Sequence, residues 1–135
     1  MSNEKYDTLD HLNSKITQWH HDKGIVSGAT DETQCNKMLE EMIELFCACH
    51  PDLDTALLRQ LFIADVNKLY REGNFKTVSK ENSLAEKIDA IGDMDVVGVN
   101  ILERNGVSKL TCLNGVYGII STRQGKVING SFVKE

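Results

Sequence analysis

Apolar residues recur at intervals of three and four along most of this chain, and that spacing predicts amphipathic helices. The first apolar stripe consists of Leu9, Leu12, Ile16 and Trp19. We expect long helices at about residues 7–23, 31–49, 54–72 and 84–105, and a shorter helix that starts after residue 108. The chain is therefore expected to be mostly helical.

The last part of the chain has a different pattern. From about residue 119 the side chains are mainly β-branched or small, and Asn129-Gly130 separates two short apolar pairs. Such a dipeptide predicts a two-residue β-hairpin. No internal repeat or linker interrupts the sequence, so it predicts one all-α domain over 1–135. The helical core covers about 7–118, and a short C-terminal β-hairpin or extended arm covers about 119–135.

Composition and charge narrow the class of protein. A length of 135 residues, 41% of them hydrophobic and 26% charged, suits one globular domain that buries a core without metal or disulfide staples. The 20 acidic residues outnumber the 15 basic ones by five, which argues against duplex nucleic acid as a partner. No apolar run approaches the roughly 20 residues of a membrane span, and no cationic segment followed by a hydrophobic one opens the chain. We therefore expect a cytoplasmic protein with no membrane partner.

The four cysteines are too few and too unevenly spread for a disulfide framework. We interpret Cys35, Cys47, Cys49 and Cys112 as reduced, mostly buried thiols. The local group of Cys47, Cys49 and His50 lacks the second pair of ligands that a zinc site needs.

Acidic residues occur inside a helix that otherwise has the pattern of a core helix. Glu41 and Glu44 are three residues apart on one face of the second predicted helix, directly after Glu40. Like charges at this spacing repel, so the pair is favourable only where cations or solvent cover it. The apolar neighbours predict that this stretch lies close to the core: Met42, Ile43, Leu45 and Phe46.

The fourth predicted helix carries a second acidic stripe, in which Asp89 and Asp93 are four residues apart and Asn100 lies seven beyond Asp93. Carboxylate pairs on facing helices suit a hard divalent cation, of which Mg²⁺ is the natural candidate and Mn²⁺ an alternative. No histidine joins either stripe, which argues against a di-iron site. Two solvated, charge-rich helix faces are the alternative interpretation. Gly92 and Gly98 in this helix indicate a close approach of a backbone or a ligand.

The motifs form an ordered set, which reads Glu40-Glu41-x-x-Glu44, Gly92-Asp93, Asn100, Tyr117, Arg123, Gly125-Lys126, Asn129-Gly130 and Phe132-Val133-Lys134-Glu135. This set resembles the MazG-like all-α nucleoside triphosphate pyrophosphohydrolases, in particular those of the phage and prophage type. Trp19, Gln34 and Lys37, ahead of the acidic motif, are also similar. The resemblance covers most of the chain apart from about 51–83.

The resemblance implies an antiparallel helical bundle that assembles as a homodimer or homotetramer. It implies Mg²⁺-dependent cleavage of a ribo- or deoxyribonucleoside triphosphate between the α and β phosphates, with a monophosphate and pyrophosphate as products. Carried over by position, Glu41, Glu44 and Asp93 are the expected metal ligands. Glu40 is expected to be a further ligand or the carboxylate that orients the attacking water.

The chain departs from the family pattern at two places. The family's second element is Glu-x-x-Asp, but Ala90 stands three residues before Asp93 in this chain. We favour Asp89 with Asp93 as the second ligand pair, and an out-of-register Glu86-x-x-Asp89 is the alternative. The helix expected at 54–72 is an addition between the motifs, and it is expected to reshape the substrate pocket.

Five further residues are candidates for substrate binding, and each has a plainer alternative. Lys37 suits phosphate or a surface ion pair, and Asn100 suits phosphate, sugar or solvent. Arg123 and Lys126 suit phosphate, in keeping with the planar fork of arginine, or belong to a solvated ribbon. Trp19 suits base stacking or the core. Two competing functions remain open: a helical nucleotide- or metal-binding regulatory protein without catalysis, motivated by Ala90, and a divalent-ion buffer.

Overall fold

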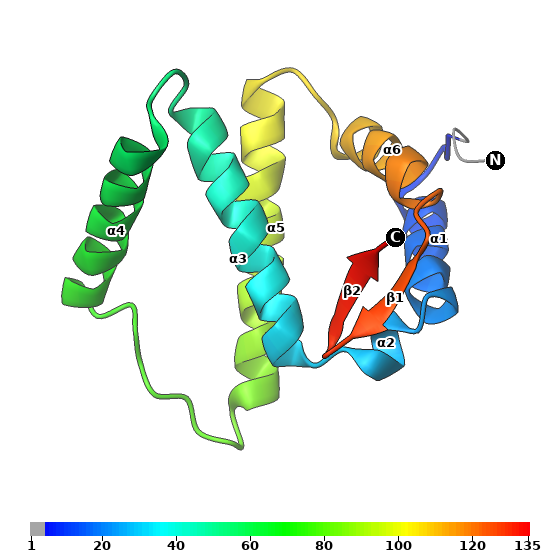
Figure 1. Ribbon diagram of the computed structural model, residues 1–135, viewed down its shortest axis with the longest axis horizontal. Helices are drawn as coiled ribbons and strands as arrows, with labels where there is room; N and C mark the ends of the chain where they lie inside the picture. Colours follow the sequence, from blue (N-terminus) through cyan, green and yellow to red (C-terminus); the bar gives the residue numbers. More distant parts are fainter. Residues whose placement is uncertain (1–4) are drawn as a thin grey trace. The chain divides into compact units, whose positions relative to one another are not determined.

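The computed structural model describes residues 5–135, which form six helices and one two-stranded antiparallel sheet (Figure 1). The elements are α1 Leu9–Asp22, α2 Ile25–Gly28, α3 Asp31–Cys49, α4 Thr55–Arg71, α5 Ser83–Arg104, α6 Lys109–Ile120, β1 Gly125–Ile128 and β2 Ser131–Lys134. The predictions of a mostly helical chain and a C-terminal hairpin are confirmed. The first four residues of the predicted 1–135 domain lie outside the described residues.

Side-chain caps fix where three of these helices begin. The Thr8 hydroxyl accepts a hydrogen bond from the backbone N–H of His11 (3.1 Å), at the start of α1. The Asp54 carboxylate accepts one from the N–H of Leu57 (2.9 Å), at the start of α4, and Ser108 caps α6 in the same way. These contacts satisfy backbone donors that the first turn of a helix leaves free.

Left-handed residues mark the sharp turns. Gly24, with φ 71°, ends α1 and leads directly into α2, which was not predicted because a four-residue helix is too short to show periodicity. In the hairpin, Asn129 and Gly130 both have positive φ, 51° and 82°, as a two-residue primed turn requires. The resulting register pairs Ile128 with Ser131.

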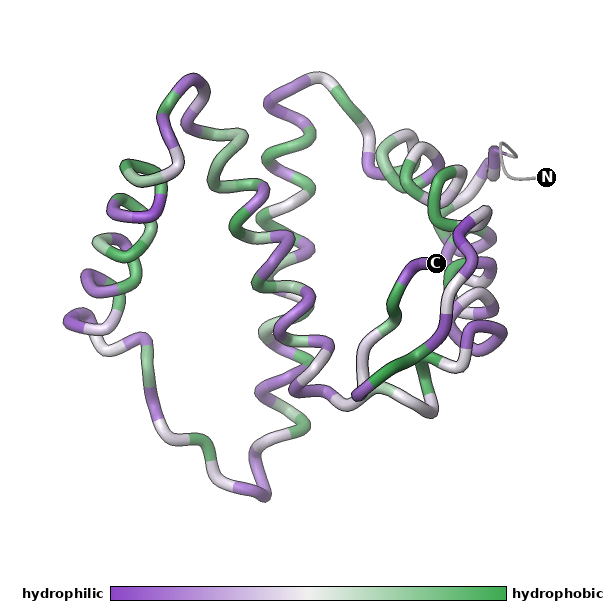
Figure 2. Tube along the Cα trace, viewed as in Figure 1, coloured by the Kyte–Doolittle hydropathy of each residue, from purple (hydrophilic) through white to green (hydrophobic). Residues whose placement is uncertain are grey.

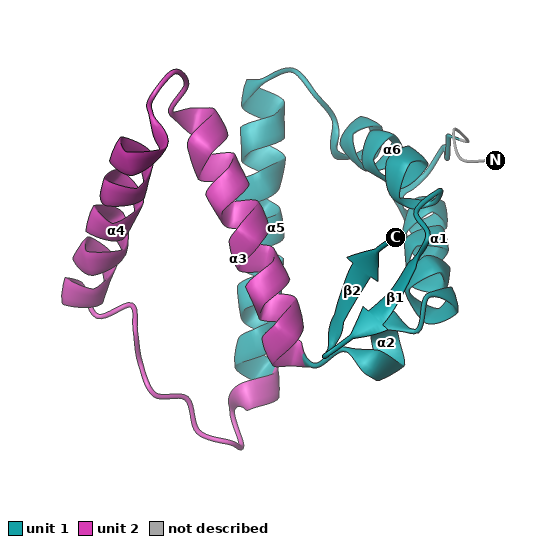
Figure 3. Cartoon of the chain, viewed as in Figure 1, with its two compact units in different colours: residues 1–30, 85–135 teal, residues 31–84 magenta. Residues whose placement is uncertain are grey.

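The chain divides into two compact units (Figure 3). The first contains the described residues up to Thr30 together with Ala85–Glu135, and in it α1 packs against α2 and α6, while β2 packs against α2. The second is Asp31–Leu84, in which α3 and α4 lie side by side and antiparallel (Figure 1). The boundary falls in the first turn of α5.

The buried core lies in the first unit. Among the described residues only Tyr6, Leu12 and Ile25 are buried apolar side chains, and Leu12 is fully enclosed. The Tyr6 ring lies edge-on to those of His11 (4.7 Å between centroids) and Tyr117 (5.9 Å). The N-terminal segment is thereby fixed against α1 and α6.

The apolar stripes of α3, α4 and α5 remain exposed, which corrects the prediction that the stretch around Glu41 lies close to the core. Within α3, α4 and α5 no residue is buried, and Met42 keeps 47% of its surface accessible (Figure 2 shows apolar positions along each helix). Ile43 and Leu45 are likewise exposed. The physical reason is that an amphipathic helix buries its stripe only against a matching surface, and a pair of helices encloses little.

The four cysteines are free thiols, as predicted, but none of them is buried. Cys35 and Cys49 are exposed, and Cys47 and Cys112 are half-buried. The expectation of mostly buried thiols was wrong, because three of the four lie on α3, whose apolar side is open.

Candidate functional site

Three carboxylates line the exposed side of α3. Glu40, Glu41 and Glu44 are all exposed, and the helical spacing places Glu40 and Glu44 one above the other with Glu41 beside them. The ammonium of Lys37 lies 3.2 Å from Glu40 Oε1. The ion pair that we weighed as the alternative for Lys37 is thus present, and a role of this lysine in phosphate binding stays a prediction.

The second acidic stripe lies on α5, in the other unit. Asp89, Asp93 and Asn100 are exposed and follow one side of this helix. Asp95, on a different side, forms an ion pair with Lys109 at the start of α6. Asp95 thus links α5 to α6, whereas Asp89 and Asp93 are exposed on their own side of α5.

The carboxylate oxygens of both stripes are the ligand type that Mg²⁺ prefers. Within residues 5–135, however, no three His, Cys, Asp or Glu side chains are grouped closely enough to hold a metal ion. The stripe on α3 belongs to the second unit, and the stripe on α5 belongs to the first. The donor chemistry therefore fits the metal, and the gathering of both stripes around one ion is a requirement of the function proposed below.

The cationic tail begins directly after α6. Arg123 is half-buried, and its backbone N–H donates to the carbonyl of Ile120 (3.0 Å). Lys126 is exposed on β1, opposite Val133 of β2. Both side chains stay candidates for phosphate binding.

Trp19 takes part in anchoring this hairpin. Its ring lies edge-on to Phe132 of β2, with 5.5 Å between the ring centroids. The indole Nε1 is buried and has no hydrogen-bond partner within the described chain. Val127 of β1 lies against Gly28 of α2, since a Cβ added to Gly28 would lie 3.0 Å from Val127 Cγ1. Packing against the hairpin is the part played by Trp19 in this structure, and base stacking stays a prediction.

The glycines of α5 have free space around them. A Cβ added to Gly92 or Gly98 would meet no atom within 4 Å apart from its own helix and its chain neighbours. The close approach that we expected at these two positions is therefore not made by any described part of this chain.

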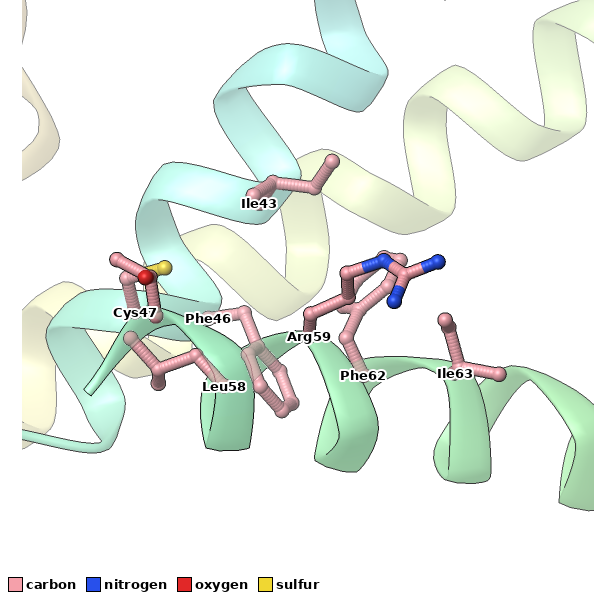
Figure 4. Close-up of a pocket in the computed structure, with 8 residues that line it drawn as sticks. Ile43, Phe46, Cys47, Leu58, Arg59, Phe62 and Ile63 are labelled. Carbon is pink, nitrogen blue, oxygen red and sulfur yellow. The ribbon is translucent and has the colours of Figure 1, made fainter. Parts of the chain in front are cut away.

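A pocket between α3 and α4, which the sequence reasoning missed, lies within the second unit and has a volume of about 290 Å³ (Figure 4). Its lining residues are Ile43, Phe46, Cys47, Thr55, Leu58, Arg59, Phe62 and Ile63. The rings of Phe46 and Phe62 meet edge to face at 5.2 Å and 84°. The available signal was the apolar stripe of α4, but a stripe alone does not reveal where two helices leave a hollow.

None of the helices in the described part of the chain is long and apolar enough to cross a membrane. No protein-family model matches the chain, and neither curated proteins nor solved structures yielded a match.

Proposed function

We propose that this protein is a Mg²⁺-dependent nucleoside triphosphate pyrophosphohydrolase that releases a nucleoside monophosphate and pyrophosphate. The observation that carries the proposal is the exposed carboxylate row of Glu40, Glu41 and Glu44 on α3. Like charges so closely spaced favour a bound cation. The motif resemblance described above supports the same reaction, and Mn²⁺ is the alternative metal.

In this proposal Glu41 and Glu44 of α3 and Asp89 and Asp93 of α5 hold the metal. Bound Mg²⁺ would supply charge neutralisation on the phosphate oxygens and a more acidic water. Glu40 accepts the proton of the attacking water, because a carboxylate is a suitable general base. The ammonium of Lys37, 3.2 Å from Glu40 Oε1, helps to orient that carboxylate.

The remaining candidates bind the substrate. Asn100, on the same side of α5 as Asp93, donates its amide N–H groups to a phosphate or sugar oxygen. Arg123 and Lys126 contribute positive charge to the polyphosphate.

Self-association is part of the proposal. The apolar stripes of α3 and α5 stay exposed within the chain, as Met42 and Val97 illustrate with 47% and 58% of their surface accessible. Extensive exposed apolar surface marks an interaction site. A homodimer or homotetramer would cover these stripes and bring carboxylates from facing helices together.

The direct test is pyrophosphate release from a panel of nucleoside triphosphates with Mg²⁺, with Mn²⁺ and with a chelator. We expect release that requires the divalent ion, and Glu41→Gln is expected to reduce it by about 100-fold or more, since a metal contributes several kcal/mol to the barrier. Glu32→Gln, an exposed position in the first turn of the same helix, is the matched control and should retain activity. No turnover of any nucleotide at any metal concentration would contradict the proposal.

A regulatory protein that binds nucleotide or metal without catalysis is the second candidate. The observation that favours it is Ala90, which occupies the position where the resembled family has a glutamate. This candidate predicts saturable, metal-dependent nucleotide binding in calorimetry with no pyrophosphate release over hours.

A further inference from the structure

The pocket between α3 and α4 has apolar walls and one charged residue. Phe46 and Ile43 of α3 lie across from Phe62 and Leu58 of α4 (Figure 4). Arg59 is the only charged side chain that lines the pocket, and it forms no ion pair or hydrogen bond with another described residue. A ligand with an apolar body and a hydrogen-bond-accepting edge fits such a lining.

The pocket adjoins the carboxylate row of α3. Cys47, in its wall, lies three residues after Glu44 and seven after Glu40, and these spacings place all three on one side of the helix. At a rise of about 1.5 Å per residue, Glu44 is about 4.5 Å from Cys47 along the helix axis, and Glu40 is about 10 Å away. A ligand seated in the pocket therefore has the carboxylates, and any cation bound to them, within the length of a nucleotide.

We propose that this pocket receives the nucleobase of the substrate, an assignment that rests on the proposed pyrophosphohydrolase function. A nucleobase is flat, has apolar faces and carries polar atoms only at its edge. The Phe62 ring offers aromatic surface for one of its faces, while the Phe46 ring, which also packs on His50 (4.3 Å between centroids), meets Phe62 edge to face and closes that wall. An apolar cavity of about 150 Å³ admits a benzene ring, so about 290 Å³ suffices for a larger heteroaromatic ring system.

Arg59 sets a preference among bases. A guanidinium has five N–H donors and no acceptor, so two of its N–H groups pair with two adjacent acceptors and not with an exocyclic amino group. Guanine and hypoxanthine present O6 and N7 side by side, whereas adenine presents an amino group beside N7. Arg59 is therefore a specificity residue that favours guanine or hypoxanthine over adenine.

One wall of the pocket is formed by α4. α4 lies in the segment of about 51–83, which the family resemblance does not cover. The inserted helix thus supplies the base-recognition surface, while α3 supplies both the opposite wall and the carboxylates.

The first experiment measures nucleoside binding without phosphates or metal, so that it does not depend on catalysis. The full chain is labelled with ¹³C at the isoleucine δ methyl groups and titrated with inosine, uridine, adenosine and cytidine. Ile43 and Ile63 line the pocket, and Ile88 and Ile119 lie outside it as internal controls. We expect saturable shifts at Ile43 and Ile63, with an affinity about tenfold higher for inosine than for adenosine, the size of one well-placed hydrogen-bonded pair. Unchanged signals at both methyls, or equal affinity for inosine and adenosine, overturn the proposal.

The second experiment uses variants of the pocket. Arg59→Met, which keeps a long side chain without a donor, is expected to remove the roughly tenfold preference for inosine over adenosine. Phe62→Leu, which keeps an apolar wall, is expected to weaken the binding of all four nucleosides about tenfold. Gln60→Ala, on α4 outside the pocket lining, should change neither property. Retention of the preference in Arg59→Met overturns the assignment, and circular dichroism checks that each variant stays folded.

The two proposals fail in distinguishable ways. Methyl shifts at Ile43 and Ile63 without pyrophosphate release under any metal condition keep the base pocket and overturn only the hydrolase. Pyrophosphate release with no shift at either methyl overturns the pocket and keeps the hydrolase.

Discussion

Asn114 of α6 holds the backbone of Tyr6 with both ends of its amide. The Tyr6 N–H donates to Asn114 Oδ1 (2.8 Å), and Asn114 Nδ2 donates to the Tyr6 carbonyl (3.0 Å). These two bonds replace the partners that a neighbouring strand would provide to an extended backbone. Asn114 therefore ties the segment before α1 to the other end of the chain's first unit.

Asn114→Ala is expected to lower the free energy of unfolding by about 1–3 kcal/mol, because it leaves a donor and an acceptor of a buried residue without their partner. Urea denaturation followed by circular dichroism measures this change. The free energy of unfolding of Asn114→Asp should fall between those of the unsubstituted chain and of Asn114→Ala, because aspartate keeps the acceptor and loses the donor. Asn13→Ala, at an exposed position of α1, is the control, and an equal loss in both variants would refute the assigned role.

At the scale of elements, periodicity predicted the long helices and their limits closely. The 54–72 expectation corresponds to Thr55–Arg71 and the 84–105 expectation to Ser83–Arg104, because caps and glycines at the ends act locally. The hairpin was predicted for the same reason, since Asn129 and Gly130 favour left-handed φ. Whether the apolar stripes are buried or exposed could not be predicted from the sequence, because burial depends on which surfaces pack together.

The same distinction, between features within one helix and features that depend on packing, applies to the candidate site. The acidic rows on α3 and α5 follow from spacing within one helix, so Glu41 and Glu44 on α3, and Asp89 and Asp93 on α5, could be placed on their faces in advance. The pocket of Arg59 could not, because it depends on how the side chains of two helices leave space between them.

The hairpin and α6 provide a matched pair of glycine substitutions. A Cβ at Gly125 would collide with the carbonyl oxygen of Val133 and the ring of Phe132, whereas a Cβ at Gly115 in α6 would meet nothing. Gly125→Ala is therefore expected to displace the hairpin and lower the melting temperature. Gly115→Ala is expected to stabilise the protein by about 0.5–1 kcal/mol through helix propensity. Thermal melts of both variants test these expectations. An unchanged melting temperature in Gly125→Ala would show that β1 and β2 are not paired as described.

At the scale of the whole molecule, burial within the chain is small for its length. Three apolar side chains are buried among residues 5–135, and a single domain of 135 residues ordinarily buries most of its apolar side chains. Much of the stability is therefore expected to come from association between copies, which makes folding depend on concentration.

The melting temperature is accordingly expected to rise with protein concentration. Met42→Glu and Val97→Glu, which place charges in the exposed stripes of α3 and α5, should lower the mass of the proposed oligomer in light scattering coupled to size exclusion. Asn36→Glu adds the same charge at an exposed polar position of α3 and should leave the mass unchanged. A monomeric mass for the unsubstituted chain at all concentrations would rule out the association.

The contact between Trp19 and Phe132 has a practical consequence, because the chain contains a single tryptophan. All indole emission therefore originates where α1 contacts β2. The wavelength of that emission, and its quenching by iodide, thus report whether the hairpin that carries Lys126 is packed against α1 or detached from it. A stopped-flow trace taken while nucleotide is added would follow the cationic tail in real time, without an attached dye.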